Sequence, residues 1–383
     1  MYPTQKDRAV GPALILAGVF IVNSSFNQSF YGHTLHHYQP EVTSRKSKNY
    51  ISVNDKEYMR KDGDEEARHN LRYGTVSFDP DKAKKLGDFD IKILPEVRED
   101  LLAKYADDKD VNKSVFPSSQ VFNELYEAGV KASKKSKGLI YQEDILVFVH
   151  GFKSDLETAM QTLAELHRRY VEPDDSPIKH LVIFTWPAKK KLLKYRSDAY
   201  DATQSGFALA RSMASLREFF KKKFVEERKP LCQQKIHLIC HSMGNRVLEN
   251  MVRGVVDIGM EINSLFAEII LVGADIDYYA LEQPHPLYRL IDFGERVHVY
   301  YHNKDQALGI SELTKNAFNR LGRWGAKNSI NLPDDIYQCD VTPIQDDKGL
   351  LHDTVHHWYY TNSPSVVEDI IHVIKGEGSI FSS

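Results

Sequence analysis

Residues 236–245 read IHLICHSMGN, and this stretch decides the fold. Its first five residues are mostly apolar and predict a buried strand. A helical pattern begins at Asn245, so Ser242 stands in a sharp turn between a strand and a helix. Such a nucleophile elbow holds a serine hydroxyl above the edge of the sheet. Gly244 lets the strand and the helix pass closely, and Cys240 replaces the glycine that is usual before the serine. We predict that Ser242 is a nucleophile; the alternative is an ordinary turn.

Strand and helix patterns alternate from Asp144 to the end of the chain. We expect strands at 145–149, 181–186, 236–240, 268–272, 297–301 and 336–341, and helices at 154–170, 204–227, 245–256 and 364–375. Ser154 and Glu157 have the spacing of a capping box, and Ser363 is the expected cap of the last helix. The alternation predicts an α/β protein with a mostly parallel, doubly wound sheet and helices on both faces. Ligands of such sheets lie beyond the carboxyl ends of the strands.

The first part of the chain is polar and irregular. We divide the chain into an N-terminal extension, 1–138, which contributes early strands and loops, and a hydrolase-like core, 139–383. A strand at 72–78 and a partly helical stretch at 116–132 are expected, followed by a basic, solvated hinge at 131–137. The apolar run 10–22 is too short to span a bilayer. We favour a buried strand at 14–22 and a cytoplasmic protein, and the alternative is a signal or anchor.

The composition excludes several classes of function. The 383 residues carry a net charge of −3, with 42% hydrophobic and 27% charged residues, which is ordinary for a globular protein and gives no reason to expect nucleic acid as a partner. We expect no cofactor, because no Gly-rich phosphate loop is present. We expect no disulfide framework and no metal site, because neither the cysteines nor the histidines near the N-terminus have the required spacing. These residues are Cys232, Cys240 and Cys339, and His33, His36 and His37.

A serine nucleophile requires donors for the oxyanion. His150-Gly151-Phe152 directly follows the strand 145–149, at the place where this fold supplies one backbone N–H. The residue after the nucleophile supplies the other, so we expect the donors to be the N–H groups of Phe152 and Met243. Gly151 lets the backbone bend toward the site. The alternative for this segment is a simple turn.

The acid and the base should follow later strands, in the chain order Ser, acid, His. Asp305 follows the strand 297–301, which is the second strand after the nucleophile helix, and we favour it as the acid. Asp275 is the competitor, and we expect it to be a cap or a carboxylate that lines the site. Three histidines lie late enough to be the base: His352, His356 and His357.

These segments resemble a largely uncharacterised, mainly bacterial α/β-hydrolase family that is esterase- and lipase-like. The similar segments are 148–152 (FVHGF), 185–188 (TWPA), Tyr195 with Asp198, 241–245 (HSMGN), 303–305 (NKD) and 357–360 (HWYY). The last segment favours His357 as the base. The chain departs from the family pattern at Phe152, Lys153 and Ala188, which affects substrate contacts more than catalysis. The residues that we expect to contact substrate are His150, Gly151, His241, Trp186 and Tyr195.

The expected function is a serine hydrolase that cleaves an ester or related acyl bond through an acyl-enzyme, with a small-molecule or lipid-like acyl substrate. Alternatives are a catalytically idle hydrolase fold that acts as a binding module, and an amidase, peptidase or acyltransferase with the same triad. The segment 189–196 carries five basic residues beside apolar ones. We read it as a solvated loop rather than a site for anionic substrates or a membrane surface.

Overall fold

The computed structural model describes residues 19–22, 50–53, 56–59, 71–93, 117–135, 143–188, 195–229, 234–257, 259–260, 264–314, 318–346 and 355–382. Several predictions fall outside these ranges: the apolar residues 10–18, the histidine cluster near the N-terminus, Cys232, the basic residues 189–194 and His352. Within the described ranges, no helix is long and apolar enough to cross a bilayer.

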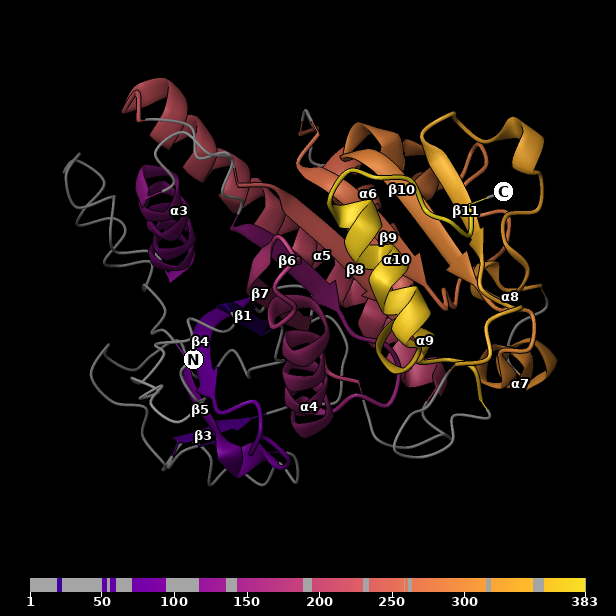
Figure 1. The fold of residues 1–383 in the computed structure, drawn as a ribbon, viewed down its shortest axis with the longest axis horizontal. Coiled ribbons are helices and arrows are strands. Elements are labelled where there is room, and N and C mark those ends of the chain that lie inside the picture. The colour runs from indigo at the N-terminus through magenta and orange to yellow at the C-terminus, as the bar shows by residue number, and fades with distance from the viewer. Residues whose placement is uncertain are drawn as a thin grey trace, which may run out of the picture.

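A nine-stranded sheet forms the centre of the molecule (Figure 1). Its order is β11-β10-β9-β8-β6-β7-β1-β4-β5. The strands are β1 (Val19–Val22), β4 (Arg72–Phe78), β5 (Phe89–Ile93), β6 (Asp144–Val149), β7 (Ile178–Thr185), β8 (Ile236–His241), β9 (Phe266–Val272), β10 (Gly294–Tyr301) and β11 (Ile336–Asp340). From β11 to β1 all neighbours are parallel, and β4 is antiparallel to both β1 and β5. The predicted α/β class and mostly parallel sheet are confirmed.

The strands β1, β4 and β5 come from the N-terminal part of the chain and continue the sheet past β7. A separate two-stranded sheet pairs β2 (Tyr50–Val53) with β3 (Lys56–Met59).

Helices cover both faces of the sheet (Figure 1). One face packs against α3 (Pro117–Lys135), α5 (Tyr195–Phe220) and α6 (Gly244–Asp257), and the other packs against α4 (Leu156–Leu166) and α10 (Pro364–Ile374). Shorter helices, α7 (Gln306–Thr314), α8 (Leu321–Trp324) and α9 (Tyr359–Asn362), lie in the connections after β10 and β11.

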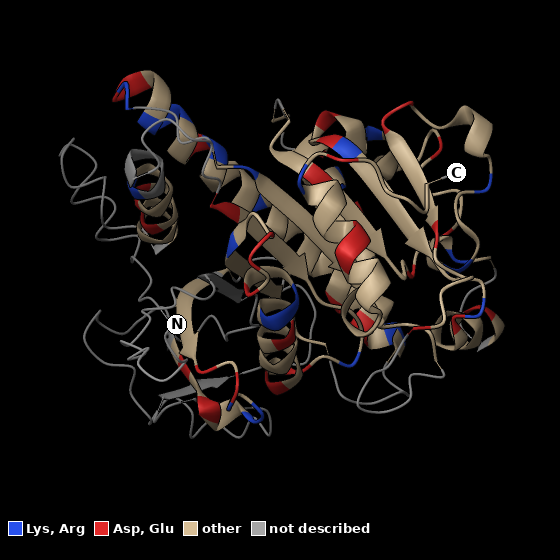
Figure 2. Ribbon diagram, in the orientation of Figure 1, with Lys and Arg blue, Asp and Glu red and all other residues tan. Residues whose placement is uncertain are grey.

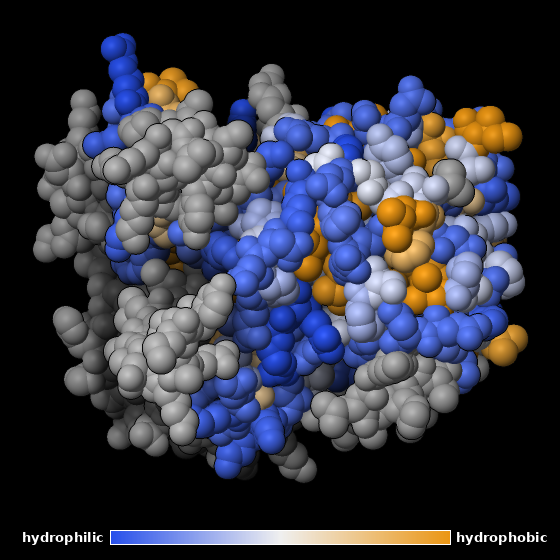
Figure 3. Space-filling model, in the orientation of Figure 1, coloured by the Kyte–Doolittle hydropathy of each residue, from blue (hydrophilic) through white to orange (hydrophobic). Residues whose placement is uncertain are grey.

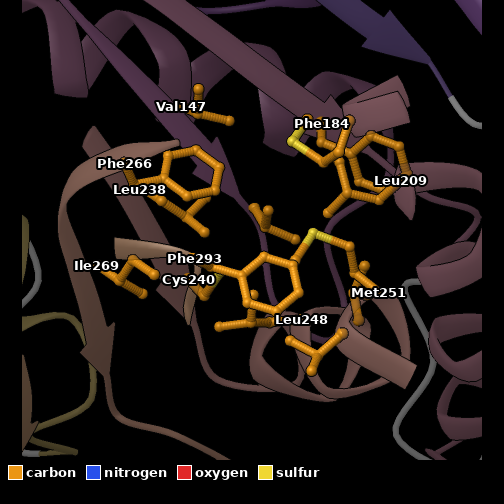
Figure 4. Packing of buried hydrophobic residues seen from close by; sticks show 14 of the residues in the cluster. Val147, Phe184, Leu209, Leu238, Cys240, Leu248, Met251, Phe266, Ile269 and Phe293 are labelled. Atoms are coloured by element: carbon orange, nitrogen blue, oxygen red, sulfur yellow. The ribbon is translucent and has the colours of Figure 1, made fainter. Parts of the chain in front are cut away.

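Alternating side chains of the central strands build two apolar cores. In β6, Val147 and Val149 join the core with α5 and α6, whereas Leu146 and Phe148 join the core with α4 and α10. Figure 4 shows the first core, where Leu209 of α5 lies beside Phe184 of β7 and Leu248 of α6 lies near Cys240 of β8. Charged residues lie mainly on the helices and loops (Figure 2), and the face in Figure 3 is largely hydrophilic with scattered apolar patches.

Two local predictions about helix starts are wrong. The N-cap of α4 is Asp155, whose carboxylate accepts from the N–H of Thr158. The capping box predicted from Ser154 and Glu157 is therefore wrong, because Ser154 is not the N-cap. The helix expected at 204–227 begins at Tyr195, because its first turns bury polar residues such as Asp198 and Asp201, a face that an apolar pattern does not reveal. The cap of α10 at Ser363 is confirmed.

Candidate active site

The turn after β8 holds Ser242 in a strained backbone conformation. Its φ is +53°, in the left-handed region that residues other than glycine rarely adopt. The N–H of Ser242 donates to the carbonyl of Val272 at 3.0 Å. The side-chain amide of Asn245 donates to the carbonyls of Cys240 (2.9 Å) and Ser242 (3.1 Å). These bonds from the next strand and from α6 hold the turn in place and offset its strain.

Two glycines allow the turn to pack closely against the end of β6. A Cβ on Gly244 would lie 2.5 Å from the carbonyl oxygen of Val149, and a Cβ on Gly151 would lie 2.7 Å from the Cβ of Ser242. Neither position has room for a side chain. The segment 150–152 therefore lies directly beside Ser242, where oxyanion donors are expected.

His150 and Trp186 fix the shape of this segment. The backbone N–H of Trp186 donates to His150 Nε2 at 3.0 Å, so Nδ1 carries the proton and donates to the carbonyl of Gly151 at 3.0 Å. The indole N–H donates to the carbonyl of His150 at 2.7 Å, and the two rings stack with centroids 5.3 Å apart. Within the described residues, Trp186 and Gly151 are not among those that line the pocket, and their contact with substrate stays a prediction.

The structure brings His357 and Asp305 together. His357 Nδ1 lies 2.6 Å from Asp305 Oδ2, and both side chains are buried. The other carboxylate oxygen accepts from the N–H of Leu308 at 2.9 Å. Burial raises the pKa of Asp305, while the His357 imidazole acts in the opposite direction. This is the geometry of a carboxylate that orients an imidazole.

Neighbouring side chains fix the position of His357. His241 Nε2 lies 3.1 Å from the carbonyl of His357, to which it donates. Burial and the nearby His357 ring hold the pKa of His241 well below its ordinary value, so His241 stays neutral. The Tyr359 hydroxyl accepts from the N–H of Gly273 at 2.6 Å and donates to the carbonyl of Tyr300 at 2.8 Å. These two bonds hold the chain two residues after His357 against the ends of β9 and β10; sequence reasoning did not predict them, although the segment HWYY contains Tyr359.

His356, the other candidate base within the described residues, faces a different neighbour. Its ring stacks on His302 with centroids 4.5 Å apart and an interplanar angle of 8°. Burial, followed by the proximity of His356, lowers the pKa of His302 to about 4. His356 is not among the residues that line the pocket, whereas His357 is.

Asp275 lines the pocket but does not contact His357 through a hydrogen bond in the described structure. Its carboxylate accepts from the hydroxyls of Tyr195 (2.7 Å) and Ser311 (2.9 Å), and Arg320 Nε lies 3.9 Å away. Its N–H donates to the carbonyl of Ser242 at 3.1 Å. Asp275 is thus a site-lining carboxylate, one of the two roles expected for it.

A pocket of about 520 Å³ opens beside these groups. Its lining includes Ser242, His357, His241, His150, Phe152 and Tyr195, together with Lys153, Asp275, residues of α4 and α7, Trp358 and Tyr360. Met243 is fully buried, so only its backbone can serve the site. No cluster of His, Cys, Asp or Glu suited to a metal ion occurs in the part of the chain that the structure describes.

Comparison with known proteins agrees with this architecture. A model of the alpha/beta hydrolase family of unknown function (DUF900) matches residues 133–375, which is more than half of the chain. The uncharacterized protein alr1448 of Nostoc sp. (strain PCC 7120 / SAG 25.82 / UTEX 2576) is 22% identical over 240 residues, covering 50% of this chain and 58% of that relative. The match thus spans less than two thirds of the relative's length. With its parallel sheet, its elbow at Ser242 and this match, the chain belongs to the alpha/beta hydrolase family of unknown function.

Proposed function

We propose that the protein is a serine hydrolase that cleaves an ester or related acyl bond through an acyl-enzyme. One observation carries the proposal. The buried hydrogen bond between His357 Nδ1 and Asp305 borders a pocket that the strained Ser242 also lines. Backbone strain at a pocket residue requires support from the surrounding structure, and it is concentrated at functional sites.

In the proposed mechanism, Ser242 Oγ attacks the acyl carbonyl while His357 Nε2 accepts the serine proton. Asp305 keeps the proton of His357 on Nδ1, so that Nε2 is free to act as the base, and it stabilises the imidazolium that forms. The bond to the leaving group then breaks as His357 returns the proton to it. Water, activated by the same imidazole, releases the acid and regenerates Ser242.

The N–H groups of Phe152 and Met243 would hold the oxyanion of each tetrahedral intermediate. The start of α6 directly after Ser242 adds a favourable dipole for this negative charge. The neutral state of His241 also helps, because a second positive ring, 4.7 Å from His357 by centroids, would disfavour the imidazolium.

A fluorophosphonate probe tests the proposal, because it phosphonylates only an activated serine. The wild-type protein should be labelled, and Ser242→Ala should lose labelling and ester hydrolysis together. Ser154 lines the same pocket but has no part in this mechanism, so Ser154→Ala is the matched control and should keep its labelling. Labelling of Ser242→Ala at the wild-type rate, with an unchanged melting temperature, would exclude Ser242 as the nucleophile.

The rival functions separate in the same experiments. An idle binding module would not be labelled. An amidase, a peptidase or an acyltransferase would be labelled, but it would prefer amides or added acyl acceptors over simple esters. We expect 4-nitrophenyl esters to turn over faster than the matching anilides, with water as the acceptor.

A further inference from the structure

Lys153 stands directly after the expected oxyanion donor Phe152 and lines the pocket. Its side chain is exposed, and its φ is +61°, a conformation that glycine and asparagine adopt at lower cost. A long cationic side chain thus occupies a position that the backbone alone would favour for a smaller residue. We propose that Lys153 makes the pocket select substrates that carry an anionic group, a carboxylate or a phosphate, in addition to the acyl bond.

The hydrogen-bond donors of the pocket wall support this inference. Four hydroxyl groups of the wall donate within the protein: Tyr195 and Ser311 to the Asp275 carboxylate, Thr158 to Asp155, and Thr162 to the carbonyl of Thr158. Their protons are therefore not directed at a substrate. Lys153 offers three N–H donors and a full positive charge. No other Lys or Arg of the described residues lines the pocket.

The charge balance of the wall points the same way. Asp275 has hydroxyl donors on both oxygens and Arg320 nearby, so its charge is largely compensated. Lys153 forms no ion pair with any residue that the structure describes. An anionic substrate group would therefore find, beside the oxyanion segment, a cation that no described carboxylate neutralises. Lys153 is exposed, so water screens part of this attraction and one contact should contribute modestly.

This inference rests on the proposed function. Its test therefore uses matched pairs of an anionic and a neutral ester and measures the ratio of their kcat/KM values. One pair is 4-nitrophenyl pentanoate and the 4-nitrophenyl monoester of glutaric acid, which differ by a terminal carboxylate. A second pair is a 1-acylglycerol and its 3-phosphate with the same acyl chain. In the wild-type protein kcat/KM should favour the anionic member of at least one pair, and the pair that responds identifies carboxylate or phosphate as the group recognised.

Lys153→Met removes the charge and should lower the anionic-to-neutral ratio of kcat/KM by roughly two- to fivefold, the size expected for one contact between exposed charges. Lys153→Glu should lower it further, and Lys153→Arg should keep most of the preference. Lys82→Met is the control, because Lys82 is exposed and pairs with Asp79 outside the pocket. For esters with slow turnover, protection of Ser242 from the fluorophosphonate gives the same comparison.

Two failures are distinguishable. If the wild-type protein is labelled and hydrolyses the neutral esters, but its ratio for both pairs equals that of Lys153→Met, the inference about Lys153 is wrong and the hydrolase proposal stands. If Ser242 is not labelled and no ester is cleaved, the proposed function itself fails.

Discussion

Replacing Asp305 by Asn gives the sharpest test of the proposed triad. The substitution keeps the shape of the side chain but removes its charge, and it places an amide where an acceptor faces His357 Nδ1. The imidazole would then adopt the other tautomer, with its proton on the nitrogen that should accept the serine proton. The imidazolium formed during catalysis would also lose its counter-ion.

The expected fall in kcat can be estimated from the contact between Asp305 and His357. Asp305 is fully buried and its oxygen lies 2.6 Å from His357 Nδ1, so water screens the pair weakly. Two unit charges about 4 Å apart attract by about 4 kcal/mol at an effective dielectric constant of about 20. With about 1.4 kcal/mol per factor of ten, kcat should fall roughly 1000-fold from the lost charge, and further from the wrong tautomer. KM should change little, because Asp305 does not line the pocket in the described residues.

Stability should respond in the opposite direction. Burial raises the pKa of Asp305, so its charged form weakens folding; this cost is full above the raised pKa and disappears as the pH falls from there to the ordinary value of 3.8. Asp305→Asn removes the cost, so its melting temperature should match or exceed that of the wild type at pH 8, with a smaller difference at acid pH.

The assay is hydrolysis of a 4-nitrophenyl ester by the wild type, Asp305→Asn and Asp275→Asn, with thermal unfolding of each protein. Asp275 is the matched control, since it is a second buried carboxylate of the same site. A folded Asp305→Asn protein that keeps kcat within tenfold of the wild type would refute the reasoning. If Asp275→Asn alone lost activity, Asp275 would be the acid.

Two further predictions concern packing and pH. Gly244→Ala would place a Cβ 2.5 Å from the carbonyl oxygen of Val149, so we expect a loss of about 1–3 kcal/mol in the free energy of unfolding and a large loss of activity. Urea unfolding and ester hydrolysis measure the two effects. Gly87→Ala is the control and should show neither, because its Cβ would meet nothing within 4 Å. His302 has a pKa of about 4, against 6.5 as its ordinary value, so the unfolded chain takes up a proton first and the wild type loses stability as the pH falls from about 6.5 to about 4. His302→Gln should lack this part of the pH dependence in thermal unfolding, and equal slopes for both proteins would contradict the assignment.

The sequence alone determined the order of the elements and the elbow. Buried parallel strands read as short apolar runs because both of their faces are covered, so β6 and β8 to β11 were predicted to within about three residues at each end. The elbow was predictable because its parts are adjacent in the chain: a strand, Ser242, Gly244 and a helix. A glycine at 244 is required by local packing against β6, which a sequence pattern can reveal.

Only the tertiary structure decided which distant side chains meet. The residues themselves left three histidines as candidates for the base, and a family resemblance favoured His357. In the fold, His357 Nδ1 lies 2.6 Å from the carboxylate of Asp305, which is 52 positions earlier in the chain. His356 instead stacks on His302. The partners of Asp275 lie 80 and 36 positions away along the chain. Such pairings depend on sheet register and loop paths, and a difference of one residue turns a side chain to the opposite direction. Periodicity records which face of an element is buried, but it contains no information about which other element supplies the contact.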